Sequence, residues 1–161
     1  FMSHNKINKI KKNIKNNFDV LYQDSLKAFK NNEVPVSALI YDPQKKKIIS
    51  KAYNTNNKDN NPCSHAEISA IIKSCKKLKK KRLDGYDLYS TLEPCLMCSS
   101  VIFASKIRRV YFAIEDKKIG AMVNNYKLAL GKHINHKIDV YYGFCEEKFS
   151  KLISNFFKKK R

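Results

Sequence analysis

The chain has 161 residues, enough for one domain with a substantial buried core. Apolar residues make up 43% of it, and no uninterrupted apolar run approaches the roughly 20 residues of a membrane-spanning helix. The net charge of +19 favours a polyanionic partner, because clustered lysines neutralise phosphates, although a bias toward A·T-rich codons would also add lysines.

The first 32 residues are expected to form helical structure in two parts. Residues 1–17 are rich in Lys, Asn and Ile, with Ile7, Ile10 and Ile14 at helical spacing, and predict a short amphipathic helix or a frayed basic extension. The start lacks the apolar core of a signal peptide, so we expect a cytoplasmic protein with Phe1 as a remnant of cloning. Residues 18–32 predict the first packed helix.

Two strands and a loop are expected next. Residues 34–41 are mostly apolar and rich in β-branched side chains, which predicts a strand buried on both faces. A turn at residues 42–45 leads to an antiparallel partner strand over residues 47–53. Residues 54–62 predict a loop, in which Asn54 ends a strand on the way to His65. An ordinary turn asparagine is the alternative interpretation of Asn54.

The rest of the chain predicts alternating helices and strands. We expect helices over residues 64–78, 95–105 and 146–157, and strands over residues 86–92, 107–114 and 138–142. There is no internal repeat and no linker, so residues 1–161 are expected to form a single domain. Its fold class is α/β, with three α/β/α layers around a mixed sheet of about five strands.

Two short motifs at predicted helix starts can build a catalytic zinc site. His65-Ala-Glu67 lies near the start of one helix, and Pro94 suits the first turn of another, with Cys95 and Cys98 on one face. One imidazole and two thiols can hold the metal and leave a fourth position open for water. The candidate ligands are therefore His65, Cys95 and Cys98.

Other interpretations of these residues stay open at this point. Glu67 is about 200° further round a helix than His65, so we interpret it as an acid/base beside the metal. A C-x-x-C pair alone would also suit a redox site, half of a structural zinc site or two core cysteines. Cys63 is either a pocket-wall residue or an alternative ligand, whereas Cys75 and Cys145 are expected to be buried.

The combined motifs are the signature of zinc-dependent deaminases, in which the glutamate is the general acid/base. Over residues 18–161 the chain resembles the bacterial tRNA-specific adenosine deaminases, which have the cytidine deaminase-like fold. The resemblance rests on Glu33-Val-Pro-Val36, Tyr53-Asn54, His65-Ala-Glu67, Thr91-Leu-Glu-Pro-Cys-Leu-Met-Cys98, Ile107-Arg-Arg-Val110, Asp116-Lys117 with Gly120-Ala121, Asn135-His136 and Phe156-Phe157 with its basic tail. The chain departs from the family pattern beside the site, at Cys63-Ser64, Ser99-Ser100 and residues 122–124.

The resemblance implies a function and a set of roles. It implies that the metal ligands hold one zinc ion per subunit and that Glu67 shuttles protons. It implies that Asn54 hydrogen-bonds the target base, with Val34, Leu92 and Pro94 as the pocket wall. The family acts as homodimers on tRNA and converts the wobble adenosine of the anticodon to inosine.

The closing residues are the predicted RNA contact. Aromatic and basic side chains can stack on bases and pair with phosphates of an anticodon stem-loop, and here they are Phe157, Lys158, Lys159, Lys160 and Arg161. The nearest alternative is a deaminase of cytosine, guanine or deoxycytidylate, which would need no broad basic surface. A non-catalytic, zinc-stabilised RNA-binding protein is a further alternative, in which Glu67 would have no use.

Overall fold

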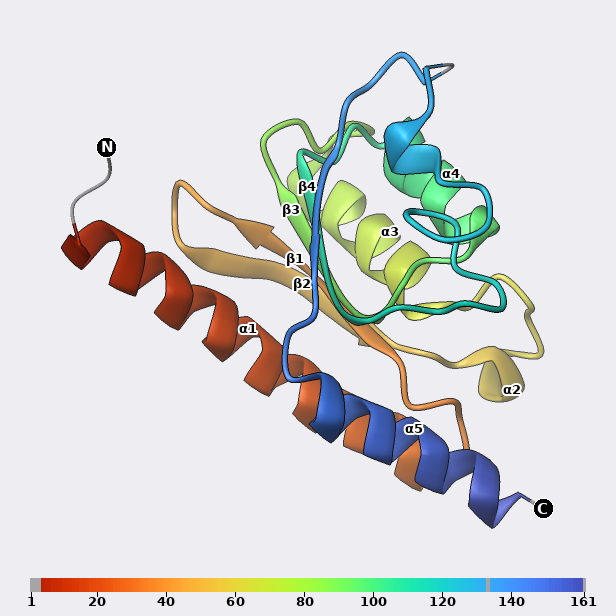
Figure 1. Cartoon of the computed structure of the whole chain (residues 1–161). Coiled ribbons are helices and arrows are strands. Elements are labelled where there is room, and N and C mark those ends of the chain that lie inside the picture. The colour runs from red at the N-terminus through yellow and green to blue at the C-terminus, as the bar shows by residue number, and fades with distance from the viewer. Residues whose placement is uncertain (1–3, 133, 161) are drawn as a thin grey trace.

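The computed structural model describes residues 4–132 and 134–160, with side chains from residue 8 onward. The strands are β1 (Ser37–Asp42), β2 (Lys47–Tyr53), β3 (Asp87–Leu92), β4 (Arg109–Ile114) and β5 (Asp139–Tyr142). They form one mixed sheet in the order β2-β1-β3-β4-β5 (Figure 1). β1 is antiparallel to β2 and β3, whereas β3, β4 and β5 are parallel.

The β1–β2 hairpin is closed by the side chain of Asp42. Its Oδ1 atom accepts hydrogen bonds from the backbone N–H groups of Gln44 (2.9 Å) and Lys45 (3.0 Å). Lys46 then adopts a positive φ of 52°, which completes the reversal of the chain. β1 lies between β2 and β3, and it is buried along its whole length.

Helices cover both faces of the sheet (Figure 1). They are α1 (His4–Lys30), α2 (Asn56–Asp59), α3 (Ala66–Leu78), α4 (Leu96–Ala104) and α5 (Glu146–Lys159), with a 3-10 helix η1 (Leu128–Leu130). α1 and α5 lie on one face, and α3 and α4 lie on the other. This arrangement confirms the predicted three-layer α/β/α fold.

The alternation of side chains along the strands divides the core into two parts. On β3, Leu88 faces α3 and α4, whereas Tyr89 faces α1 and α5. Tyr89 packs edge-on against Phe18 of α1, with ring centroids 5.6 Å apart, and Phe18 in turn contacts Phe149 of α5. The site described below lies on the α3 and α4 side, near the end of β3.

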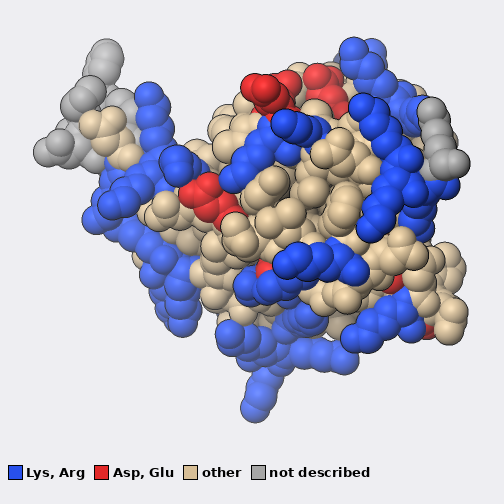
Figure 2. Space-filling model, turned by 90° about the horizontal axis from the view of Figure 1, so that it is seen from below, with Lys and Arg blue, Asp and Glu red and all other residues tan. Residues whose placement is uncertain are grey.

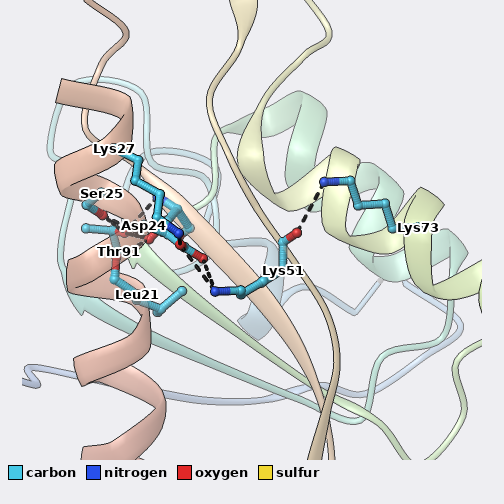
Figure 3. Close-up of polar contacts among 8 residues, drawn as sticks. Leu21, Asp24, Ser25, Lys27, Lys51, Lys73 and Thr91 are labelled. Carbon is cyan, nitrogen blue, oxygen red and sulfur yellow. Dashed lines mark hydrogen bonds and ion pairs between the residues drawn. The ribbon is translucent and has the colours of Figure 1, made fainter. Parts of the chain in front are cut away.

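Buried hydroxyl groups fasten α1 to the sheet on the opposite side. Thr91 Oγ1 lies 3.1 Å from both Ser25 Oγ and Ser37 Oγ, and it accepts a hydrogen bond from the Ser37 backbone N–H (2.9 Å). Ser37 Oγ donates to the Leu21 carbonyl at 2.6 Å. Figure 3 shows this network between α1 and the strands.

α1 is longer than the sequence analysis predicted. It runs without a break from His4 to Lys30, so residues 4–17 belong to the same helix as the packed residues that follow. Extending an existing helix costs little compared with nucleating a new one, which explains why the basic stretch is helical. Asp24 anchors the packed half by pairing with Lys27 (2.8 Å) and with Lys51 of β2 (3.3 Å) (Figure 3).

Two further local expectations were wrong. The predicted loop after Tyr53 contains the short helix α2. Cys145 is exposed at the start of α5, where the backbone adopts a φ of 54°, and Cys75 is only partly buried. None of the helices in the described part of the chain combines the length and hydrophobicity needed to cross a bilayer.

Candidate active site and metal centre

The three predicted metal ligands meet where α3 and α4 begin. His65 and Cys95 immediately precede these helices, and Cys98 lies in the first turn of α4. One donor atom from each residue lies within 4.8 Å of the others. His65 Nδ1 is 3.7 Å from Cys95 Sγ and 3.4 Å from Cys98 Sγ.

These separations suit a tetrahedral zinc ion. With Zn–S bonds of about 2.3 Å and Zn–N bonds of about 2.0 Å, neighbouring ligand atoms of a tetrahedron lie roughly 3.5–3.8 Å apart. Three nitrogen and sulfur ligands with a fourth position left for water are typical of catalytic zinc. The donor set and its geometry therefore fit one zinc ion.

The two thiols have different electrostatic environments. The hydrogen bond with Cys98 and the neighbouring His65 lower the pKa of Cys95 to about 4, which favours its thiolate, the form that binds metal. The same contact, together with burial and the nearby Glu67, raises the pKa of Cys98. A bound cation would favour the thiolate of both residues. The contact with Cys95 also raises the pKa of His65.

Glu67 points at this cluster without belonging to it. Its side chain is buried, and Cys98 Sγ donates to Oε2 at 3.6 Å. Ser90 Oγ on β3 lies 3.2 Å from Glu67 Oε1 and 2.8 Å from the Leu92 carbonyl. Burial raises the pKa of Glu67, so the carboxyl can hold a proton nearer neutral pH than an exposed glutamate can.

Asn54 is held with a defined amide orientation. Its Oδ1 atom accepts a hydrogen bond from the backbone N–H of Ala66 (2.9 Å), at the first residue of α3. The oxygen is therefore engaged, and within the described residues Nδ2 has no acceptor. Asn54 also lines the cavity beside the cluster, so its NH₂ group is available to a ligand.

A cavity of about 770 Å³ opens beside the metal ligands. Its wall includes the predicted residues Val34 and Leu92, together with Ile153 and Phe157 of α5. Pro94 is buried and does not line the cavity. Instead its carbonyl accepts a hydrogen bond from the Ala121 N–H at 2.9 Å.

Glu93 organises the loop on one side of the cavity. This buried carboxylate accepts hydrogen bonds from the backbone N–H groups of Asp116 (3.0 Å), Val123 (2.9 Å) and Asn124 (3.0 Å). Any Cβ at position 120 would collide with Glu93 and with the Asp116 carbonyl, so only Gly120 fits there. No role for Glu93 was predicted, although a charged residue directly after a predicted strand was a usable signal.

The remaining predicted site residues lie at the edge. Cys63 is exposed, and its backbone N–H is bound to Asn61 Oδ1 at 2.9 Å; it is not part of the ligand cluster. Phe157 is half-exposed at the cavity wall. Beyond it lie three exposed residues, Lys158, Lys159 and Lys160, whereas Arg161 lies outside the described residues.

The class of the domain follows from this geometry and from comparison with known families. Residues 11–114 match the family described as the cytidine and deoxycytidylate deaminase zinc-binding region. A guanine deaminase from Nitrosomonas europaea has a similar structure, with a TM-score of 0.76 over 87% of this chain and 82% of that chain. Its 18% sequence identity shows a shared fold alone. The domain is thus a zinc-binding deaminase domain.

Closer relatives define the family within this class. The tRNA-specific adenosine deaminase of Rickettsia bellii is 42% identical over 83% of this chain and 92% of its own length. That of Aquifex aeolicus is 41% identical over 88% and 92%. A solved structure from studies of A-to-I editing by tRNA:A34 deaminases matches with a TM-score of 0.81 and 31% identity, over 85% of this chain and 98% of that one. The chain belongs to the tRNA-specific adenosine deaminase family.

Proposed function

We propose that this chain hydrolyses the wobble adenosine of a tRNA anticodon to inosine and ammonia, and that it does so in the cytoplasm. The observation that carries this proposal is the buried Glu67 carboxyl, which points at the three metal ligands beside an open cavity. A structural zinc site has no use for such a carboxylate. The relatives named as tRNA-specific adenosine deaminases supply the substrate class.

Each residue of the site has a distinct part in this reaction. Zinc, when bound, supplies Lewis-acid activation of the attacking water. Glu67 takes a proton from that water as it adds to C6 of adenine and passes this proton to the ring nitrogen. It then transfers the proton of the new C6 hydroxyl group to the leaving amine. The C6–N bond then breaks, ammonia leaves and a carbonyl remains at C6. The Ser90 hydroxyl lies 3.2 Å from Glu67 Oε1 and 2.8 Å from the Leu92 carbonyl, so it links the Glu67 carboxyl to the end of β3.

The cavity can orient the base before the reaction. Asn54 Nδ2 is placed to donate a hydrogen bond to a ring acceptor, because its amide oxygen is already engaged by α3. Val34 and Leu92 offer apolar surface to the flat faces of the base. A base must leave its stack to reach such a site, and an anticodon loop offers unpaired bases at low cost.

The end of α5 is suited to the rest of the anticodon loop. Phe157 can stack on a neighbouring base, and the side chains of Lys158, Lys159 and Lys160 follow at the surface. Phe156 is buried against Phe29, so it has a packing role. We include Arg161 in the proposed contact by its place in the sequence.

We further propose that the chain acts as a homodimer. Exposed apolar side chains lie near the start of α4, where Leu96, Ile119 and Tyr126 line a shallow hollow of about 670 Å³. A second copy of the chain would cover them. Sedimentation velocity should give the mass of a dimer, and Tyr126→Glu should shift it to a monomer. A monomeric native protein would contradict the proposal.

Inosine formation on a defined RNA tests the function directly. The zinc-loaded protein should convert the wobble adenosine of an anticodon stem-loop to inosine, detected by mass spectrometry of the digested RNA. A matched stem-loop with its adenosine one position away should react poorly. Free adenosine, cytidine and guanine are the small-molecule comparison, and they should show negligible turnover. Turnover of a free compound at the rate of the stem-loop would favour a small-molecule deaminase.

A further inference from the structure

The first half of α1 projects beyond the sheet that its second half covers (Figure 1). Between residues 8 and 16 no side chain is buried, and burial begins at Asn17 and Phe18. The helix has 27 residues and is therefore roughly 40 Å long. The projecting part adds little to the core, so its side chains are available to bind a partner.

That projecting part carries a concentration of lysines. Together with the β1–β2 turn it forms what we call the N-terminal basic surface, whose exposed members are Lys9, Lys11, Lys12, Lys15, Lys45, Lys46 and Lys47. Figure 2 shows lysine side chains gathered around this end of α1, with few acidic ones among them. Among the described residues, only Lys15 of these seven forms an ion pair, with Asp19 at 3.0 Å.

Two of these lysines come from different elements and lie near each other. Lys9 on α1 lowers the pKa of Lys46 in the turn, as expected for neighbouring positive charges. Six of the seven ammonium groups have no carboxylate partner within the described residues. An arrangement of this kind costs folding free energy unless an anion neutralises it, so it points to a ligand with several negative charges.

The position of this surface suggests which polyanion binds. α1 and α5 run in the same direction, because Phe149 contacts Phe18 and Phe156 contacts Phe29. The carboxyl end of α1 leads directly to Val34 in the cavity wall. Lys9 is about 30 Å from that end along the helix axis. We propose that the N-terminal basic surface binds the phosphate backbone of the stem of a tRNA whose anticodon loop occupies the cavity. This inference rests on the proposed function.

An anionic membrane is the rival partner for a basic amphipathic helix. Such a helix binds lipid by inserting its apolar face. Here Ile14 packs against the core around Phe18, whereas Ile10 is 40% exposed, so the described part of the projecting segment offers little apolar surface for insertion. The lysines can then contact phosphates without insertion, which suits an RNA backbone. Lysine contacts of this type are independent of base sequence.

Two RNA hairpins with the same anticodon loop separate this surface from the active site. A stem of about five base pairs extends roughly 15 Å, whereas one of about fifteen pairs extends roughly 45 Å and can reach the lysines. The test variant is Lys9→Gln/Lys11→Gln/Lys12→Gln. Its matched control is Lys76→Gln/Lys80→Gln/Lys81→Gln, which removes the same charge from exposed residues around the end of α3. Circular dichroism checks that both variants remain folded.

The native protein and the control should bind the long hairpin about tenfold more tightly than the short one at low salt. The test variant should lose that advantage, and its salt dependence on the long hairpin should weaken by roughly 2 to 3 in log–log slope, at about 0.9 per phosphate. Deamination of the short hairpin should be unchanged in all three proteins, and its absence would instead refute the proposed function.

Three results would overturn the inference. The first is binding of the long hairpin by the test variant as tightly as by the native protein. Equal losses of affinity for the long hairpin in the test and control variants would show that the effect depends on net charge alone and not on where the lysines lie. Binding of anionic phospholipid vesicles that is lost in the test variant, with long-hairpin affinity intact, would assign the surface to a membrane.

Discussion

Ser90 and Thr91 are neighbours on β3, and their buried hydroxyl groups serve opposite faces of the sheet. Thr91 lies among Ser25 and Ser37, where each hydroxyl finds a partner within the protein. Ser90 instead contacts Glu67, whose carboxyl lies beside metal ligands and an open cavity. A polar network that is satisfied internally fixes structure, whereas one with donors and acceptors directed at a cavity can do chemistry.

The largest expected effect is on the cavity side, at the ligands. Cys98→Ser should abolish deamination and reduce bound zinc far below one ion per chain, because a buried thiolate ligand is lost. Elemental analysis of the purified protein measures the zinc. Cys63→Ser is the matched control and should keep both zinc and activity. Loss of zinc in Cys63→Ser would show that the ligand set is different.

Among residues away from the cavity, we expect the largest effect on the free energy of unfolding from a charged pair at the start of β3. Asp87 is buried, and Arg108 donates to its two oxygens at 2.8 and 2.7 Å. Arg108→Met should destabilise the fold by about 2–3 kcal/mol at pH 7, because it leaves a buried carboxylate without its partner. Urea unfolding of the native protein and of the variant, at pH 7 and at lower pH values, measures this loss of stability.

The loss of stability caused by Arg108→Met should depend on pH in a defined direction. Burial raises the pKa of Asp87, so protonation of this group favours the folded state. Loss of Arg108 should raise that pKa further. The loss of stability should therefore be full above the pKa that Asp87 has in the folded variant, and it should shrink as the pH falls through that pKa. A loss of stability that grows on acidification would contradict this account of the pair.

Thr91→Val tests the satisfied network with a nearly isosteric change. The backbone N–H of Ser37 loses its acceptor, so unfolding should become easier by about 1–2 kcal/mol. The kcat of the folded protein should stay within about twofold of the native value. A large fall in kcat without loss of stability would show that the α1 side of the sheet takes part in the chemistry.

Ser90→Ala is the counterpart on the other face. Removal of its hydroxyl frees one oxygen of Glu67, so we expect a fall of about tenfold in kcat with zinc retained. The change in unfolding free energy should stay below about 1 kcal/mol. Ser90→Thr keeps the hydroxyl and should recover part of the rate. Loss of stability with kcat unchanged would place Ser90 with Thr91 as a structural residue.

The features that could be predicted from the sequence are those that depend on residues close to one another along the chain. The strands and the ligand motifs were predicted because apolar runs and the spacing around His65 and Cys95 are local signals. The roles of Ser90 and Glu93 depend on contacts with residues 23 and 30 positions away, which local spacing does not report. The unbroken α1 was missed because its basic first part is helical by extension of the packed part that follows. The exposure of Cys145 was missed because burial depends on how α5 packs on the sheet.

In the proposed reaction, Glu67 performs proton transfer beside the metal without binding it. The most direct measurement compares Glu67→Gln with the native protein for zinc content and for inosine formation on the wobble-adenosine stem-loop. We expect about one zinc ion per chain in both proteins and a loss of roughly 10²–10⁴-fold in kcat for Glu67→Gln. Near-native activity, or loss of zinc together with activity, would contradict the assignment of Glu67 as the acid/base.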